Sequence, residues 1–172
     1  IITPSTKAAQ GEHDESVSPS ELYKRGAVDP GLYKELARIS MKLYERGVSR
    51  AAEHGMIFVD TKYEFGISNG KIMLMDEVNT PDSSRYWMKD DYEERFEKGE
   101  EPRKLDKEYV RTWLSEQGFT GDGNPPKLTD DIRVEASARY MEVVEKFTGE
   151  PMQLDVGPVD KSIYSILNPF AY

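Results

Sequence analysis

The sequence predicts an α+β domain in which one antiparallel β-hairpin packs with several helices. In two long stretches, starting near Pro30 and near Asp130, apolar residues recur at spacings of three and four, which is typical of amphipathic helices. Between these stretches, two extended-type runs flank Ser68-Asn69-Gly70, a good hairpin signal. A length of 172 residues fits one domain, or one lobe of a larger protein.

Composition excludes several classes of function. A formal net charge of −9 argues against nucleic-acid and membrane-surface partners, because binding phosphate backbones requires clustered Lys and Arg. The absence of cysteine excludes disulfides, thiolate metal sites and cysteine nucleophiles. No apolar run approaches the roughly 18 residues of a membrane span, and no signal peptide opens the chain. A soluble, cytoplasmic protein is therefore expected.

Two helices are predicted in the first third of the chain. Ser18 is a suitable N-cap for a short helix from Pro19 to about Ala27. Asp29 and Pro30 read as the cap and first position of the longest helix, which Gly55 would end. Its apolar stripe comprises Leu32, Leu36, Ile39 and Leu43.

Two more helices are predicted after the hairpin. The acidic stretch from Lys89 to Glu101 is expected to be a solvated helix or loop, and a helix is expected from about Asp106 to Gln117. Thr129 or Asp130 would cap the last long helix. Its predicted inner stripe comprises Ile132, Ala136, Tyr140, Val143, Val144 and Phe147.

The hairpin can be drawn in two registers. A two-residue turn at Asn69-Gly70 would pair Glu64 with Met75 and mix polar and apolar side chains on both faces. A three-residue loop would pair Phe65 with Met73 and gather apolar residues on one face. Because a one-residue slip inverts every side chain, the pattern favours the second register.

Charged residues alternate along the first predicted strand of this hairpin. Asp60, Lys62 and Glu64 would share one face, and in the favoured register Asp76 joins them from the neighbouring strand, opposite Lys62. Carboxylates beside a lysine suit a Mg²⁺-phosphate site, because Mg²⁺ takes one or two carboxylates together with phosphates and water. The alternative is an exposed strand face with alternating charges, which is common in antiparallel sheets.

Two polar loops add further candidates. From Asp76 to Trp87 the chain is rich in hydroxyls around a single arginine, Arg85, a composition that suits phosphate or carboxylate recognition. The alternative is an ordinary turn anchored by Tyr86 and Trp87. The segment Thr3–Asp14 could line a polar site, but its residue types alone favour a surface loop.

Four stretches, in order along the chain, resemble the SAICAR synthetase (phosphoribosylaminoimidazole-succinocarboxamide synthase) family. Thr3–Asp14 and Leu74–Trp87 resemble its two signature stretches. Asp60–Gly66 resembles the strand before the second signature, and Leu105–Arg111 the helix after it.

The resemblance implies the C-terminal lobe of a two-lobed α+β fold related in outline to kinases and ATP-grasp enzymes. The implied reaction joins L-aspartate to a carboxyaminoimidazole ribotide, giving SAICAR, ADP and phosphate. ATP would phosphorylate the ribotide carboxylate, and the aspartate amine would displace the phosphate. Such a transfer depends on positioning and charge neutralisation and needs no protein nucleophile.

The resemblance also implies roles for particular residues. Glu64 and Asp76 would bind Mg²⁺ beside the co-substrate ATP. Asp60 and Lys62 would be the catalytic pair and would hold the ribotide together with Arg85. The remaining substrate-binding candidates are Ser84, Lys107, Arg111, Lys7, His13 and Asp14.

The family's N-terminal lobe, with its Gly-rich loop over the phosphates, has no counterpart in these 172 residues. We therefore expect residues 1–172 to form the C-terminal part of the enzyme, to need that lobe as a partner, and to be inactive alone. Two alternatives are another ATP-dependent small-molecule phosphotransferase and a non-catalytic nucleotide-binding module. The stretch Asp82–Trp87 argues against the phosphotransferase.

Overall fold

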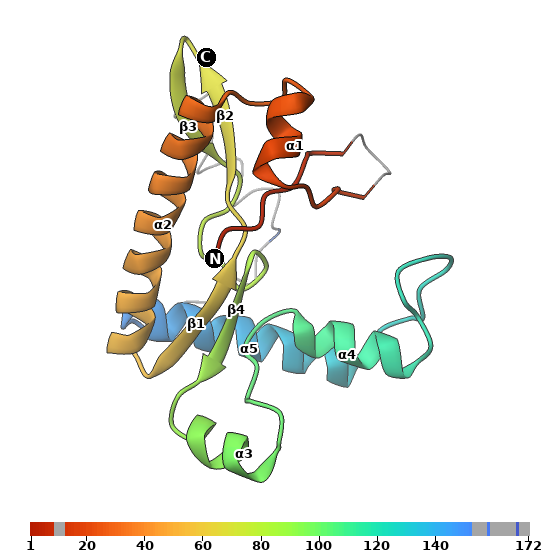
Figure 1. The fold of residues 1–172 in the computed structure, drawn as a ribbon. Coiled ribbons are helices and arrows are strands. Elements are labelled where there is room, and N and C mark those ends of the chain that lie inside the picture. Colours follow the sequence, from red (N-terminus) through yellow and green to blue (C-terminus); the bar gives the residue numbers. More distant parts are fainter. Residues whose placement is uncertain (9–12, 153–157, 159–167, 169–172) are drawn as a thin grey trace.

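A computed structural model describes residues 1–8, 13–152, 158 and 168. Figure 1 shows the described helices arranged around two small antiparallel sheets. Along the chain the elements are α1 (Pro19–Lys24), α2 (Pro30–Glu53), β1 (Met56–Thr61), β2 (Glu64–Ser68), β3 (Lys71–Met75), β4 (Ser84–Met88), α3 (Tyr92–Lys98), α4 (Glu108–Glu116) and α5 (Asp130–Thr148). The α+β class predicted from the sequence is confirmed.

The predicted helix starts are confirmed where a side chain caps the first turn. The Ser18 hydroxyl accepts from the Glu21 amide, and Asp29 accepts from the first amides of α2. Thr129 caps α5 in the same way. The prediction of the inner stripe is wrong for one residue, because Val144 is exposed, whereas Val143 beside it is buried.

The strand pairing differs from the single long hairpin expected from the sequence. β1 pairs with β4, while β2 pairs with β3. Lys62 and Tyr63 belong to neither β1 nor β2, so the prediction that Asp60, Lys62 and Glu64 share one face of one strand is wrong. The chain leaves one sheet and enters another between Thr61 and Glu64.

The favoured hairpin register is also wrong. Glu64 pairs with Met75, and the strands are joined by a two-residue turn in which Asn69 and Gly70 have φ of 50° and 72°. Two positive φ values are the signature of the turn that Asn-Gly favours, because its twist matches that of the strands. The predicted pairing of Lys62 with Asp76 fails as well, since β3 ends at Met75.

The core lies between the β1–β4 pair, α2 and α5. Its buried residues are Ala51, Met56, Phe58, Tyr86, Met88, Leu105 and Val143. Gly47 lets α2 approach β1 closely, because a Cβ there would lie 2.7 Å from the Phe58 ring. The Tyr44 hydroxyl reinforces this contact by donating to the carbonyls of Phe58 and Val59.

A short extended segment, residues 103–106, lies along the free edge of β4. The Met88 amide donates to the Arg103 carbonyl over 3.0 Å, and the Leu105 amide donates to the Tyr86 carbonyl over 2.9 Å. This segment brings the start of α4 back to the start of β4, with α3 looped out between them (Figure 1). Across the described ranges, no helix combines the length and apolarity needed to cross a membrane.

Candidate active site

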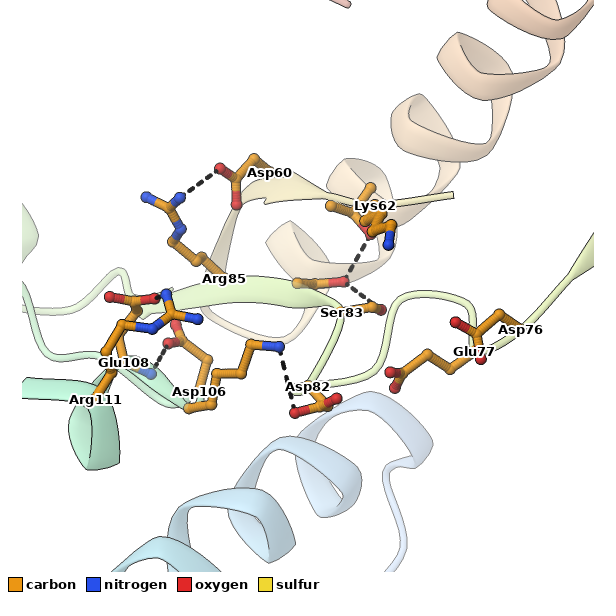
Figure 2. Close-up of a pocket in the computed structure, with 13 residues that line it drawn as sticks. Asp60, Lys62, Asp76, Glu77, Asp82, Ser83, Arg85, Asp106, Glu108 and Arg111 are labelled. Carbon is orange, nitrogen blue, oxygen red and sulfur yellow. Dashed lines mark hydrogen bonds and ion pairs between the residues drawn. The ribbon is translucent and has the colours of Figure 1, made fainter. Parts of the chain in front are cut away.

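A cavity of about 430 Å³ opens where β1 ends, β4 begins and α4 begins. Its lining residues are Asp60, Thr61, Lys62, Asp76, Glu77, Asp82, Ser83, Ser84, Arg85, Asp106, Lys107, Glu108 and Arg111. Figure 2 shows Arg85, Asp106 and Arg111 on one side of this cavity and Asp76 with Glu77 on the other. The cavity therefore has a cation-bearing end and an acidic end.

Arg85 and Asp60 face each other across the β1–β4 pair. Their side chains form an ion pair of 3.2 Å, and each is about half exposed. The β-sheet register shifts between Phe58 and Asp60, and this irregularity sets Asp60 opposite Arg85. An exposed pair of this kind contributes little stability, so an anionic ligand can displace Asp60 from the guanidinium at low cost.

The loop between β3 and β4 is held at Asn79 by two tyrosines. The Tyr63 hydroxyl donates to the Asn79 side chain over 2.8 Å, and the Tyr86 hydroxyl donates to its carbonyl over 2.5 Å. Burial raises the pKa of Tyr63 to about 12. Asn79 itself has a positive φ of 57°, a conformation that asparagine tolerates better than most residues.

Hydroxyl groups fix the rest of this loop. Thr80 donates to Glu77 and accepts from the Ser83 amide, while the buried Ser84 donates to Thr61 over 2.9 Å. The predicted substrate residue Ser84 thus lines the cavity with its hydroxyl engaged by β1.

An ion-pair network joins the N-terminal loop to the strands. Lys62 contacts Glu64 at 2.9 Å and Asp14 at 3.0 Å, and Lys7 also binds Glu64. The hydrogen bonds from Lys62 and Lys7 hold the pKa of the Glu64 carboxyl below its usual value. The structure therefore brings together four of the predicted site residues, namely Lys7, Asp14, Lys62 and Glu64. His13, which was also predicted to bind substrate, is exposed to solvent.

The start of α4 supplies two further cations. Lys107 lies 3.5 Å from Asp82, and Arg111 pairs with Glu108. The two cations and their two acidic partners all line the cavity. From the sequence, Lys107 and Arg111 were assigned to the site only through the family resemblance. Their pairs are partly exposed, so the cations can exchange partners when a ligand arrives.

Sequence reasoning assigned no role to Asp106, whose side chain is only 2% exposed. It accepts from the Tyr86 amide over 3.0 Å and from the Glu108 amide over 2.8 Å. Burial raises the pKa of the Asp106 carboxyl, and these two amide hydrogen bonds oppose that rise. An Asp at the start of a predicted helix was the available signal, because such residues commonly cap first turns.

The two predicted metal ligands lie in different settings. Asp76 lines the acidic end of the cavity beside Glu77, whereas Glu64 lies outside the lining and is bound by Lys7 and Lys62. Among the residues described, no three His, Cys, Asp or Glu side chains form a ready-made metal cage. Such a sparse donor set fits Mg²⁺, which takes much of its coordination from phosphates and water.

Fold and cavity together define an α+β protein with a polar, mixed-charge site suited to phosphorylated ligands. A family model described as SAICAR synthetase matches residues 1–127. The chain belongs to the SAICAR synthetase family.

Similar proteins agree in sequence and in fold. The chain is 53% identical over 152 residues to a phosphoribosylaminoimidazole-succinocarboxamide synthase of Bacteroides thetaiotaomicron, covering 87% of this chain and 48% of that protein. A Cytophaga hutchinsonii protein of the same name is 46% identical over 171 residues, covering 97% of this chain and 55% of its own length. The chain thus spans about half the length of the curated relatives it matches.

Solved structures show the same relationship. A SAICAR synthase from Saccharomyces cerevisiae, complexed with SAICAR, matches with a TM-score of 0.71 and 38% identity over 90% of this chain and 48% of that one. A SAICAR synthetase in complex with ADP matches with a TM-score of 0.59 and 27% identity, covering 83% and 48% of the two chains.

Proposed function

We propose that this chain provides the ribotide-binding part of an ATP-dependent ligase that joins L-aspartate to carboxyaminoimidazole ribotide, forming SAICAR. One observation carries the proposal: Arg85, Lys107 and Arg111, from two separate elements, line one cavity together with Asp60 and Lys62. Family membership and the relative complexed with SAICAR support it.

The cation-bearing end suits the phosphate of the ribotide. Within the described residues, Arg85, Lys107 and Arg111 pair with partly exposed carboxylates, which a phosphate dianion can replace with stronger charge-assisted hydrogen bonds. Asp60 and Lys62 would then orient the reacting carboxylate end of the ribotide. The lysine neutralises negative charge that accumulates as the carboxylate is phosphorylated.

The acidic end suits a magnesium ion and the phosphates of ATP. Asp76 would hold the ion from the cavity, and Glu64 would join once Lys7 or Lys62 turns toward substrate. When bound, Mg²⁺ would neutralise the transferring phosphate. The structure of a relative in complex with ADP supports the use of ATP.

We further propose that residues 1–172 give no ligase turnover by themselves, and that the family's nucleotide-binding lobe completes the site. The share of each relative that the chain spans supports this, at 48% and 55%. Turnover of ATP, L-aspartate and ribotide by the purified 172-residue chain would refute it. A cytoplasmic location stays a prediction, which cell fractionation would test.

Calorimetric titration of the 172-residue chain with SAICAR tests the ribotide site. We expect saturable binding that Arg85→Ala weakens about tenfold or more, because a charge-assisted hydrogen bond contributes about 1.5–3 kcal/mol. Arg133→Ala is the matched control, since Arg133 is exposed on α5 and does not line the cavity. The absence of binding by the folded chain, or equal losses in both variants, would overturn the proposal.

A further inference from the structure

Asp106 is a buried carboxylate whose two oxygens both accept backbone hydrogen bonds, one from each of two elements. Its Oδ2 accepts from the amide of Tyr86 in β4, and its Oδ1 accepts from the amide of Glu108, the first residue of α4. The side chain is 2% exposed, so water does not replace either contact. The carboxylate therefore connects the strand to the start of the helix.

The bond to β4 replaces one rung of a regular ladder. The Leu105 amide donates to the Tyr86 carbonyl, and in a continuing antiparallel pair the Tyr86 amide would donate back to the Leu105 carbonyl. It donates instead to Asp106. The chain can thus leave the edge of β4 and turn into α4 without leaving the buried Tyr86 amide unpaired.

The two connected elements carry the three cations of the cavity. Arg85 precedes Tyr86 in β4, while Lys107 and Arg111 flank Glu108 at the start of α4. The distance between the two groups of cations therefore depends on how the start of α4 is held against β4. Figure 2 shows the Asp106 side chain beside the Glu108–Arg111 pair, with Arg85 on the same side of the cavity.

We propose that Asp106 is a positioning residue for the ligase reaction: it fixes the start of α4 against β4 and so places Lys107 and Arg111 with Arg85 around one ribotide phosphate. This inference rests on the proposed function and assigns Asp106 no direct contact with substrate. Both oxygens are required. An asparagine offers one acceptor, and its NH₂ group would face the second amide donor.

The test compares SAICAR binding by the 172-residue chain and its Asp106→Asn variant, with circular dichroism to confirm folding. We expect affinity to fall about tenfold or more, because small misplacements of binding groups have large effects. Asp29→Ala is the control for a purely structural effect. Asp29 also accepts two amides at a helix start, but it lies outside the cavity, so its loss should lower the melting temperature and leave affinity unchanged.

A double-mutant cycle separates positioning from general loosening. If Asp106 acts through the arrangement of the cations, Asp106→Asn should weaken binding less in an Arg85→Ala background than in the wild type. Should Asp106→Asn fail to fold, Asp106→Glu, which keeps two acceptors one methylene further out, is measured instead and is expected to fold and bind more weakly.

The outcomes distinguish this inference from the function on which it rests. A wild-type chain that does not bind SAICAR overturns both. A wild-type chain that binds, together with a folded Asp106 variant of unchanged affinity or with additive effects in the cycle, overturns the positioning role alone.

Discussion

Tyr86 connects several segments next to the cavity through its backbone and its side chain. Its backbone bonds to Leu105 and to the Asp106 side chain, its hydroxyl donates to the Asn79 carbonyl, and its ring is fully buried. The ring centroid lies 5.1 Å from that of Phe58 and 5.5 Å from that of Phe147. A change at this residue should therefore affect both the core and the loop that lines the cavity.

Tyr86→Phe should keep the ring packing and remove only the hydroxyl. The Asn79 carbonyl would lose its donor, at a cost of about 1–2 kcal/mol in the free energy of unfolding measured with urea. Tyr33→Phe is the control, because the Tyr33 hydroxyl makes no hydrogen bond within the described part of the chain. Equal stability of wild type and Tyr86→Phe would contradict the prediction.

Glu64 provides a prediction about pH. Hydrogen bonds from Lys62 and Lys7 lower its folded-state pKa below the ordinary 4.5. The link between the N-terminal loop and β2 should thus be fully formed above pH 4.5 and be lost as pH falls through the lowered value. NMR titration of the Glu64 carboxyl should show this midpoint, and Lys62→Met should move it up toward 4.5.

Lys71→Met is the matched control for that titration, because Lys71 is an exposed lysine on β3. It should leave the Glu64 midpoint unchanged. A wild-type midpoint at or above 4.5 would show that the network does not form in solution.

At the scale of elements, local signals were readable from the sequence and distant pairings were not. Ser18, Asp29 and Thr129 each accept a hydrogen bond from a backbone amide no more than three residues further along the chain. Because these capping contacts are local, the residue types predicted the starts of α1, α2 and α5. The pairing of β1 with β4 joins Ile57 to Trp87, which lie thirty positions apart in the sequence, and no local pattern encodes it. The cavity follows from that pairing, so its geometry could not be drawn from the sequence.

The register error has a separate cause. The predicted register requires one face of the hairpin to be buried, yet Ile67, Met73 and Met75 are about half exposed, and they lie on both faces. When neither face is buried, the side-chain pattern exerts little control over register, and the turn residues decide. The turn residues Asn69 and Gly70 therefore predict the register better than the alternation of apolar side chains does.

Of the two sheets in the described part of the chain, the β2–β3 pair should be the less protected. A two-stranded ribbon is marginally stable by itself, whereas β1 and β4 bury Met56, Phe58 and Tyr86 in the core. Hydrogen–deuterium exchange followed by mass spectrometry should show faster exchange in residues 64–75 than in 56–61 and 84–88. Equal protection of the two sheets would contradict this expectation.

At the scale of the whole molecule, one side chain connects the two longest helices. Arg50 of α2 donates through Nε and Nη2 to the Phe147 carbonyl near the end of α5, over 3.0 and 2.6 Å. A cation there also complements the negative end of the α5 dipole. Arg50 thus helps to hold α5 against the core residues of α2 and β1.

Arg50→Met should keep much of the aliphatic packing and remove both hydrogen bonds. We expect the free energy of unfolding to fall by about 1–2 kcal/mol, measured by chemical denaturation. Arg46→Met, which alters an exposed arginine one turn earlier on α2, should change it by less than about 0.5 kcal/mol. A larger loss from Arg46→Met than from Arg50→Met would contradict this role.

The looped-out position of α3 makes it a natural insertion point for protein engineering. The excursion leaves β4 at Met88 and returns at Arg103, and the backbones of these two residues are joined by a hydrogen bond of 3.0 Å. Because its two ends meet, the loop can lengthen at small entropic cost without moving the strand edge that leads to α4. A peptide tag or fluorescent reporter placed near Gly99 would thus be carried on the surface, leaving the ligand cavity intact.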